Sequence, residues 1–207
     1  MLYPVMLNVA GKQVVVVGGG SVAARKAAAL LEAGAEVTII SPALSAAMNE
    51  WLCACSTVQW KKKTFEPADI QGAFLIIAAT NQRDVNSYVR QCAADDQLIN
   101  VADDPKASNF HVPASLKKGN LTIAVSTNGA SPGLSKQLIH ELSNQYNDEF
   151  VRFIDFLEEC RQQVKEKVKD PEKRKDILTQ LIQPDFYKLL FHAGREERMR
   201  LFQTLLD

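Results

Sequence analysis

The feature that most constrains this chain is a run of valines that breaks into three glycines, Val14–Val17 followed by Gly18, Gly19 and Gly20. A β-branched apolar run is typical of a buried strand, and the alanine-rich stretch that follows is typical of a helix. The spacing G-x-G-x-x-A places a tight turn at Gly18, a close approach of backbone to a pyrophosphate at Gly20, and close helix–strand packing at Ala23. A plain strand-to-helix turn in another kind of α/β protein is the alternative, so the surrounding sequence has to decide.

That surrounding sequence predicts a complete β-α-β unit. Residues 24–33 have helical character, Gly34 ends the helix, and residues 36–41 form a second apolar strand. The second strand ends in Ser41-Pro42, where an acidic residue would normally hold the ribose hydroxyls of NAD. Because no arginine closely follows Ser41 to receive a 2′-phosphate, the pattern favours NAD over NADP.

Composition and charge exclude several classes of protein. The chain has 207 residues, of which 46% are hydrophobic and 23% charged, and its formal net charge is zero. There is therefore no overall basic field to attract nucleic acid or anionic lipid. Residues 1–7 are apolar but lack a basic region, which predicts a first edge strand and not a signal peptide. No window reaches the roughly 20 apolar residues of a membrane span, so we expect a cytoplasmic protein.

The cysteines and histidines give no sign of a metal site. Cys53 and Cys55 are close together, but the four cysteines form no CxxC pair, and the three histidines lie far apart in the sequence. We expect reduced thiols and no protein-bound metal.

Strands and helices alternate through the first half of the chain. Strands are expected near Val14, Val37 and Val58 and over 74–79 and 98–101, with a helix over 84–94. This order predicts an α/β fold with a Rossmann-type, doubly wound parallel sheet, whose ligands bind beyond the carboxyl ends of the strands. The predicted cofactor-binding residues at that edge are Gly18, Gly19, Gly20, Ser21, Val22, Ser41, Pro42, Ala43, Thr80, Asn81 and Val101.

The second half of the chain changes character twice. A turn is expected over 116–120, a strand over 121–127, and a helix that opens at Ser131-Pro132. From Asp148 onward, apolar residues recur at helical spacing, and the aromatic stripe among them is read as bundle core, with a ligand-facing role as the alternative. The expected domains are therefore 1–113 for the dinucleotide, a small α+β segment at 114–146, and a helical region at 147–207.

Four motifs in order carry a specific resemblance. They are the glycine loop over 17–26, Ile77-Ala78-Ala79-Thr80-Asn81, Asn100-Val101-Ala102-Asp103-Asp104-Pro105, and the segment Ala124 to Pro132. Together they resemble the precorrin-2 dehydrogenase family, and the N-terminal module of bifunctional siroheme synthases, over about residues 1 to 145.

The resemblance implies an enzyme of siroheme synthesis that oxidises precorrin-2 to sirohydrochlorin with NAD⁺ as hydride acceptor. It also implies a homodimer in which the segment 114–146 builds the subunit interface. Some members also insert Fe²⁺ into sirohydrochlorin, so a bifunctional dehydrogenase and ferrochelatase is one alternative, which would reuse Asp103 and His111. A non-catalytic NAD-sensing module is a remote alternative that leaves the motifs after residue 100 unexplained.

Two adjacent carboxylates compete for the role of catalytic base. Asp103 follows a core strand at the ligand-binding edge and matches the family's catalytic aspartate, so we predict it to be the general base. Asp104 precedes a proline, and a turn cap is the simpler interpretation for it. A turn cap is also the alternative for Asp103.

Residues for the substrate are harder to select. Ser126 and Thr127 match a serine-rich strand end of the family and are predicted to bind the substrate, with turn bonding as the alternative. A substrate rich in carboxylates also needs cations. Lys106 is predicted to bind it, and the further candidates are Lys117, Lys118 and Lys136. A solvated surface position is the alternative for each of these lysines. Arg25 and Lys26 are expected on a solvated helix face.

Overall fold

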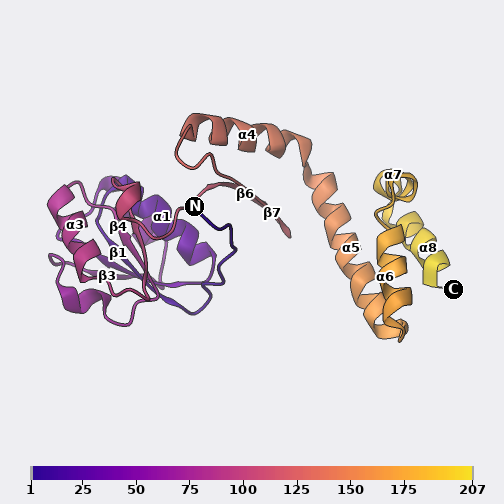
Figure 1. The fold of residues 1–207 in the computed structure, drawn as a ribbon, viewed down its shortest axis with the longest axis horizontal. Helices are drawn as coiled ribbons and strands as arrows, with labels where there is room; N and C mark the ends of the chain where they lie inside the picture. The colour runs from indigo at the N-terminus through magenta and orange to yellow at the C-terminus, as the bar shows by residue number, and fades with distance from the viewer. Residues whose placement is uncertain (1, 207) are drawn as a thin grey trace. The chain divides into compact units, whose positions relative to one another are not determined.

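The computed structural model describes residues 2–206, which form one compact unit up to Val112 and a second from Pro113 onward (Figure 1). The strands of the first unit are β1 (Gln13–Val17), β2 (Glu36–Ile40), β3 (Gln59–Lys61), β4 (Leu75–Ala78) and β5 (Leu98–Val101). Its helices are α1 (Ser21–Glu32), α2 (Ala46–Cys53), α3 (Arg83–Cys92) and the short 3₁₀ turns η1 (Pro67–Ile70) and η2 (Pro105–Ala107).

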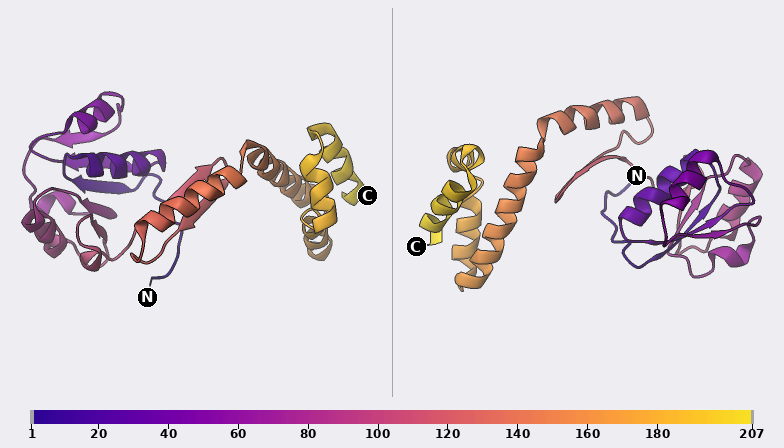
Figure 2. Two further views of the ribbon diagram at one scale, coloured as in Figure 1. Left: turned by 90° about the horizontal axis from the view of Figure 1, so that it is seen from above. Right: turned by 180° about the vertical axis from the view of Figure 1, so that it is seen from behind.

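The five strands form one parallel sheet in the order β3-β2-β1-β4-β5. Helices α1 and α2 cover one face, and η1 and α3 cover the other (Figure 2). The sheet is therefore doubly wound, as predicted, with β1 at its centre and the crossover between its two halves beside the glycine loop.

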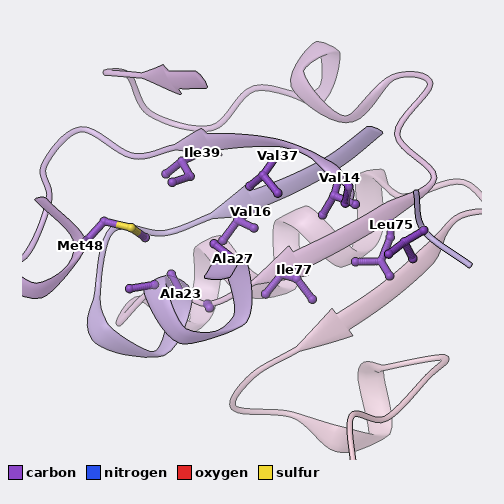
Figure 3. Close-up of a cluster of buried hydrophobic side chains, with 13 residues drawn as sticks. Val14, Val16, Ala23, Ala27, Val37, Ile39, Met48, Leu75 and Ile77 are labelled. Carbon is purple, nitrogen blue, oxygen red and sulfur yellow. The ribbon is translucent and has the colours of Figure 1, made fainter. Parts of the chain in front are cut away.

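The valine run of β1 is buried on both sides, which explains its uninterrupted apolar character. Val14 and Val16 face α1 and pack with Ala23 and Ala27, as Figure 3 shows, while Val15 and Val17 lie in the cluster on the opposite face. Because Ala23 is fully buried, the helix approaches the sheet as closely as the third position of the motif requires.

The outer edge of β5 is covered by side chains instead of by another strand. The backbone N–H of Val101 donates to Ser108 Oγ (2.9 Å), and that of Ile99 donates to Asn109 Oδ1 (2.8 Å). Asn109 Nδ2 in turn donates to the carbonyl of Gln97 (2.8 Å). Ladder groups that would otherwise be open to solvent are thereby satisfied at this edge.

The second unit begins with an antiparallel hairpin of β6 (Ala114–Lys118) and β7 (Leu121–Val125), packed against α4 (Pro132–Gln145). The expected turn over 116–120 is wrong for its first three residues, which belong to β6, because the loop is only Gly119-Asn120 and Gly119 has a positive φ of 52°. The predicted start of α4 is confirmed: Ser131 Oγ accepts the N–H of Leu134 at 3.2 Å.

Four further helices form a bundle with an aromatic core. They are α5 (Asp148–Lys167), α6 (Pro171–Gln180), α7 (Pro184–His192) and α8 (Arg195–Leu206). Phe153 is buried, and its ring contacts those of Tyr187 and Phe191 at centroid distances of 5.3 and 5.7 Å. Arg198 is also buried and donates from Nε to the carbonyl of Leu190 (2.6 Å), which satisfies the C-terminal end of α7. The aromatic stripe is bundle core, as predicted.

The N-terminal segment differs from its prediction. Residues 2–9 form no strand, and Tyr3, Val5 and Met6 are exposed, while Met1 lies outside the described residues. An apolar sequence alone does not make an edge strand when no neighbour pairs with it. Within residues 2–206, no helix has the length and apolar character needed to cross a bilayer.

Candidate active site

The carboxyl ends of the parallel strands bring four separate segments together. The N–H of Gly18 donates to the carbonyl of Ile40 (2.9 Å), that of Ala79 to Val17 (2.8 Å), and that of Ala102 to Ala78 (2.9 Å). Each loop therefore starts in hydrogen-bonding contact with the neighbouring strand. The expectation that these segments converge at one edge of the sheet is confirmed.

Two of the three glycines are required by the packing of the backbone. Gly18 has a φ of 132°, and a Cβ atom there would overlap the carbonyl oxygen of Ala79. A Cβ atom on Gly19 would overlap the carbonyl oxygen of Ala43. The loop that follows β1 is therefore pressed against the loops that follow β4 and β2, and only glycine allows this approach.

Gly20 differs from its neighbours because a Cβ atom there would meet no atom of the protein within 4 Å. It is the N-cap of α1, and since it has no side chain, no side chain caps the first-turn N–H groups. Ser21 and Val22, the first two residues of the helix, are exposed. Open space, uncapped amides and the helix dipole together suit a dinucleotide pyrophosphate.

The segment after β2 divides into one internal and two exposed residues. Ser41 is buried, its Oγ donates to the carbonyl of Ala43 (2.6 Å), and its own carbonyl accepts the indole N–H of Trp60 (3.0 Å). Pro42 and Ala43 are exposed. The hydroxyl of Ser41 therefore shapes the turn, and it is the two following residues that face solvent at the predicted cofactor site.

Asn86 joins the loops that follow β4 and β5. Its Oδ1 accepts the N–H of Thr80 (3.0 Å), and its Nδ2 donates to Oδ1 of Asp103 (2.8 Å). Val101, at the end of β5, is buried, whereas Asn81 is exposed in the loop after β4. Thr80 and Asp103, both predicted site residues, are thus linked through a residue that was not predicted.

The two adjacent aspartates have different surroundings. Oδ1 of Asp104 accepts the N–H groups of Lys106 (2.9 Å) and Ala107 (3.3 Å), so this carboxylate caps η2, as its turn-cap reading predicted. Asp103 caps no turn: Oδ1 is bound by Asn86, and Oδ2 lies 3.6 Å from Nε of Arg83. Unlike Asp104, Asp103 is therefore joined through the side chain of Asn86 to the loop that follows β4.

Lys26 does not lie on a solvated helix face, and that expectation is wrong. Its Nζ donates to Oδ1 of Asn100 (2.9 Å), a buried residue of β5 whose Nδ2 donates to the carbonyl of Phe110 (3.1 Å). The pKa of Lys26 is lowered mainly by its partial burial and, to a smaller extent, by the nearby charge of Arg25. Arg25 itself is exposed, as expected.

The predicted substrate residues differ in whether their side chains already make hydrogen bonds within the protein. Oγ1 of Thr127 accepts the N–H of Ser131 (3.0 Å), and Oγ of Ser126 accepts the N–H of Asn128 (3.1 Å), so both hydroxyls take part in turn bonding. Lys106 is exposed.

The further lysine candidates separate in the same way. The ammonium group of Lys118 is already used within the protein, because its Nζ donates to the carbonyls of Ser143 (2.9 Å) and Tyr146 (3.1 Å) at the end of α4. Lys117 and Lys136 are exposed.

His111, named with the bifunctional alternative, lies with Nε2 3.2 Å from the carbonyl oxygen of Pro105. Among residues 2–206, no three His, Cys, Asp or Glu side chains are grouped so that they could hold a metal ion.

Asn86 is the site residue that sequence reasoning missed. It lies three positions before Val89, and both are buried on the same face of α3. A polar residue on the apolar face of a helix predicts a buried hydrogen-bond partner, and this was the available signal. The partners themselves, Thr80 and Asp103, are not visible from local sequence.

Comparison with known proteins gives a consistent assignment. A family described as putative NAD(P)-binding matches residues 5–114, the sirohaem biosynthesis protein central family matches 118–143, and the SirC C-terminal domain matches 150–188. The solved structure of SirC, a precorrin-2 dehydrogenase, superposes with a TM-score of 0.82 at 32% identity and covers 99% of this chain and 98% of its own.

Curated relatives agree with that structure. The precorrin-2 dehydrogenase of Priestia megaterium is 36% identical over 94% of this chain and 96% of its own, and that of Bacillus subtilis is 33% identical over 77% and 98%. The siroheme synthase of Nitrosomonas eutropha is 34% identical, but this chain spans only 43% of it. The geometry of the sheet edge, the three matched regions and these relatives agree, and the chain belongs to the precorrin-2 dehydrogenase family.

Proposed function

We propose that this protein oxidises precorrin-2 to sirohydrochlorin with NAD⁺ as the hydride acceptor. The observation that carries the proposal is the placement of Asp103: it lies at the carboxyl edge of the sheet and is joined through Asn86 to Thr80, next to the glycine loop. A carboxylate base beside a dinucleotide loop is what removal of a hydride and a proton from one substrate requires.

The cofactor site is built mainly from backbone. Gly18 and Gly19 let three loops meet, and Gly20, Ser21 and Val22 present the open N-terminus of α1 for the pyrophosphate. We assign the remaining cofactor contacts to the neighbouring loops, namely Ser41, Pro42, Ala43, Thr80, Asn81 and Val101. When bound, NAD⁺ supplies the two-electron acceptor that no amino-acid side chain can provide.

Asp103 supplies the other half of the reaction. Oxidation of precorrin-2 removes one hydride and one proton from the reduced macrocycle, and the carboxylate of Asp103 accepts the proton. We assign this step to Oδ2, because Oδ1 already accepts a hydrogen bond from the buried Asn86. The proton then passes to water before the next turnover, so the net products are sirohydrochlorin, NADH and a proton.

The remaining assignments concern the substrate and the assembly. We assign Ser126, Thr127 and the exposed Lys106 to substrate binding, because the side chains of precorrin-2 are carboxylates that accept hydrogen bonds from cations and hydroxyls. We also propose a homodimer formed through residues 114–146, within a division at 1–113, 114–146 and 147–207. Cytoplasmic location stays a prediction.

An anaerobic assay tests the proposal directly. The purified protein is incubated with precorrin-2 and NAD⁺ while NADH absorbance and the sirohydrochlorin spectrum are followed, and Fe²⁺ or Co²⁺ is then added. NAD-dependent formation of sirohydrochlorin is expected. Faster metal insertion than in a protein-free blank would add the ferrochelatase activity, whereas NAD binding without oxidation would leave the NAD-sensing alternative.

A further inference from the structure

Asn86 is a buried amide whose hydrogen bonds all go to two residues. Its Oδ1 accepts from the backbone N–H and the hydroxyl of Thr80, at 3.0 and 2.8 Å. Its Nδ2 donates to the carbonyl of Thr80 at 3.2 Å and to Oδ1 of Asp103 at 2.8 Å. Only 1% of the residue is exposed, so water does not compete for these bonds.

The contacts with Thr80 fix the orientation of the amide. Because the same threonine binds both ends of the side chain, the plane of the amide cannot rotate without breaking bonds at a buried position. The direction of the second N–H of Nδ2 is then fixed, and this N–H points at Oδ1 of Asp103. Asn86 therefore transfers the rigidity of the sheet edge to a carboxylate whose own residue is exposed.

Arg83 is the other partner of Asp103, and it is much less able to fix an orientation. Its Nε lies 3.6 Å from Oδ2, and 80% of its side chain is exposed. An exposed ion pair of this kind is screened by solvent and contributes little. The neutral amide of Asn86 and the cation of Arg83 thus offer two competing explanations for how Asp103 is held.

We infer that Asn86 is the positioning residue of the reaction: it holds Oδ1 of Asp103 and so fixes the carboxylate whose Oδ2 accepts the substrate proton. This inference rests on the proposed function, because it assigns a role within that same site. Asn86 does not touch the reacting atoms, and it acts only through Asp103.

The substitution Asn86→Asp tests this role with almost no change in volume. The new carboxylate still accepts the N–H of Thr80 but cannot, when ionised, donate to Asp103. We expect kcat to fall about 10- to 100-fold at neutral pH, the cost of a misplaced catalytic group. The KM for precorrin-2 is expected to stay within about twofold. The Kd for NAD⁺ is measured beside it, because Asn86 also binds Thr80, which we assign to the cofactor site.

The pH dependence of kcat separates this role from a merely structural one. Two carboxylates in contact hold a proton more tightly than one, so the acidic limb of the profile moves to higher pH in Asn86→Asp. Arg83 and the neighbouring Asp104 are the other charged groups beside Asp103, and they are unchanged in this variant.

Two matched variants serve as controls. Asn100→Asp makes the same exchange at another buried asparagine, one that binds Lys26 and does not contact Asp103, and it should leave the pH profile unchanged. Arg83→Gln removes the competing partner and should lower kcat less than threefold. A full loss in Arg83→Gln with none in Asn86→Asp, or equal shifts in both asparagine variants, would overturn the inference.

A readout without turnover keeps the inference separate from the proposed function. The side-chain amide signals of Asn86 in a ¹⁵N-labelled sample should change with pH in the wild type and lose that change in Asp103→Asn. If the wild type fails to oxidise precorrin-2, the proposed function fails, while this titration still decides whether the amide binds Asp103. No pH-dependent change in the wild type would contradict the contact itself.

Discussion

The carboxyl edge of the sheet and the bundle α5–α8 are held together by different forces. At the edge, glycines let backbones meet and a buried asparagine connects polar side chains, so position is set by hydrogen bonds. In the bundle, position is set by aromatic rings around Phe153 and by buried aliphatic side chains. At the edge, buried polar groups fix the geometry of the site, whereas in the bundle the burial of apolar area stabilises the fold.

This contrast predicts that substitutions in the two regions separate activity from stability. A change at the edge that overlaps no other protein atom should alter catalysis or cofactor affinity with little effect on unfolding, and a change in the bundle core should do the reverse. Four experiments test that separation, in order of decreasing expected effect.

Asp103→Asn should give the largest effect. It preserves the shape of the side chain but removes the base, so kcat is expected to fall about 10²- to 10⁴-fold while NAD⁺ still binds. Steady-state kinetics and calorimetric titration of NAD⁺ measure the two quantities. Asp104→Asn is the matched control, because asparagine also caps a turn. Unchanged turnover in Asp103→Asn would remove this residue from the mechanism.

Phe153→Ala should act on the other region alone. The ring is 1% exposed and lies among other aromatic rings, so its removal should cost about 3–5 kcal/mol of unfolding free energy for the bundle. Urea unfolding followed by circular dichroism measures this, with Leu189→Ala on the exposed side of α7 as control. A loss of NAD⁺ affinity under native conditions would show that the two regions are not separable in this way.

Gly20→Ala sharpens the comparison within the edge. The added methyl group meets no protein atom, so Tm should change little, but it fills the space where a pyrophosphate approaches. We expect NAD⁺ affinity to fall about tenfold, or about 1.4 kcal/mol. Gly18→Ala is the contrasting variant, because its methyl group overlaps Ala79 and should also lower Tm. Equal stability losses in both variants would contradict this distinction.

Cys160→Ala should give the smallest effect, and this effect is a change in how the unfolding free energy depends on pH. Burial in the bundle raises the pKa of its thiol from 9.0 to about 12, so the folded protein keeps the thiol protonated where the unfolded chain releases it. Unfolding free energy should therefore decrease as pH rises above about 9, and this decrease should be weaker in Cys160→Ala. Urea unfolding at pH 8 and pH 10 measures the difference, and parallel losses in both proteins would exclude the thiol as its cause.

Local sequence was sufficient where a signal acts over a few residues. The valine run and the glycine spacing of the first unit, and the serine cap before Pro132 in the second, are such signals, and the structure has a strand, a turn and a helix start at these places. Strand β6 was missed because Lys117-Lys118-Gly119-Asn120 has the composition of a turn. The alternation of Ala114 and Leu116 was its signal, and the two-residue loop made the strand longer than that composition suggested.

The candidate site was only partly predictable, because its contacts join distant positions. Asp103 could be selected from its place after a strand, but the difference from Asp104 depends on Asn86, which is 17 residues away. The lysines show the same limit. Lys26 was expected in solvent, but it binds Asn100, which is 74 residues away in the chain. Residue type and spacing identify candidates, and tertiary contacts decide among them.

The side chains that cover β5 also limit how this protein can associate. Since Ser108 and Asn109 occupy the N–H groups of Val101 and Ile99, no strand from another molecule can extend the sheet at that edge, which guards against aggregation. Lysines at and after β3 protect the opposite edge by charge. Within residues 2–206 the hairpin β6–β7 pairs only with itself, so its outer edges are not covered by a further strand.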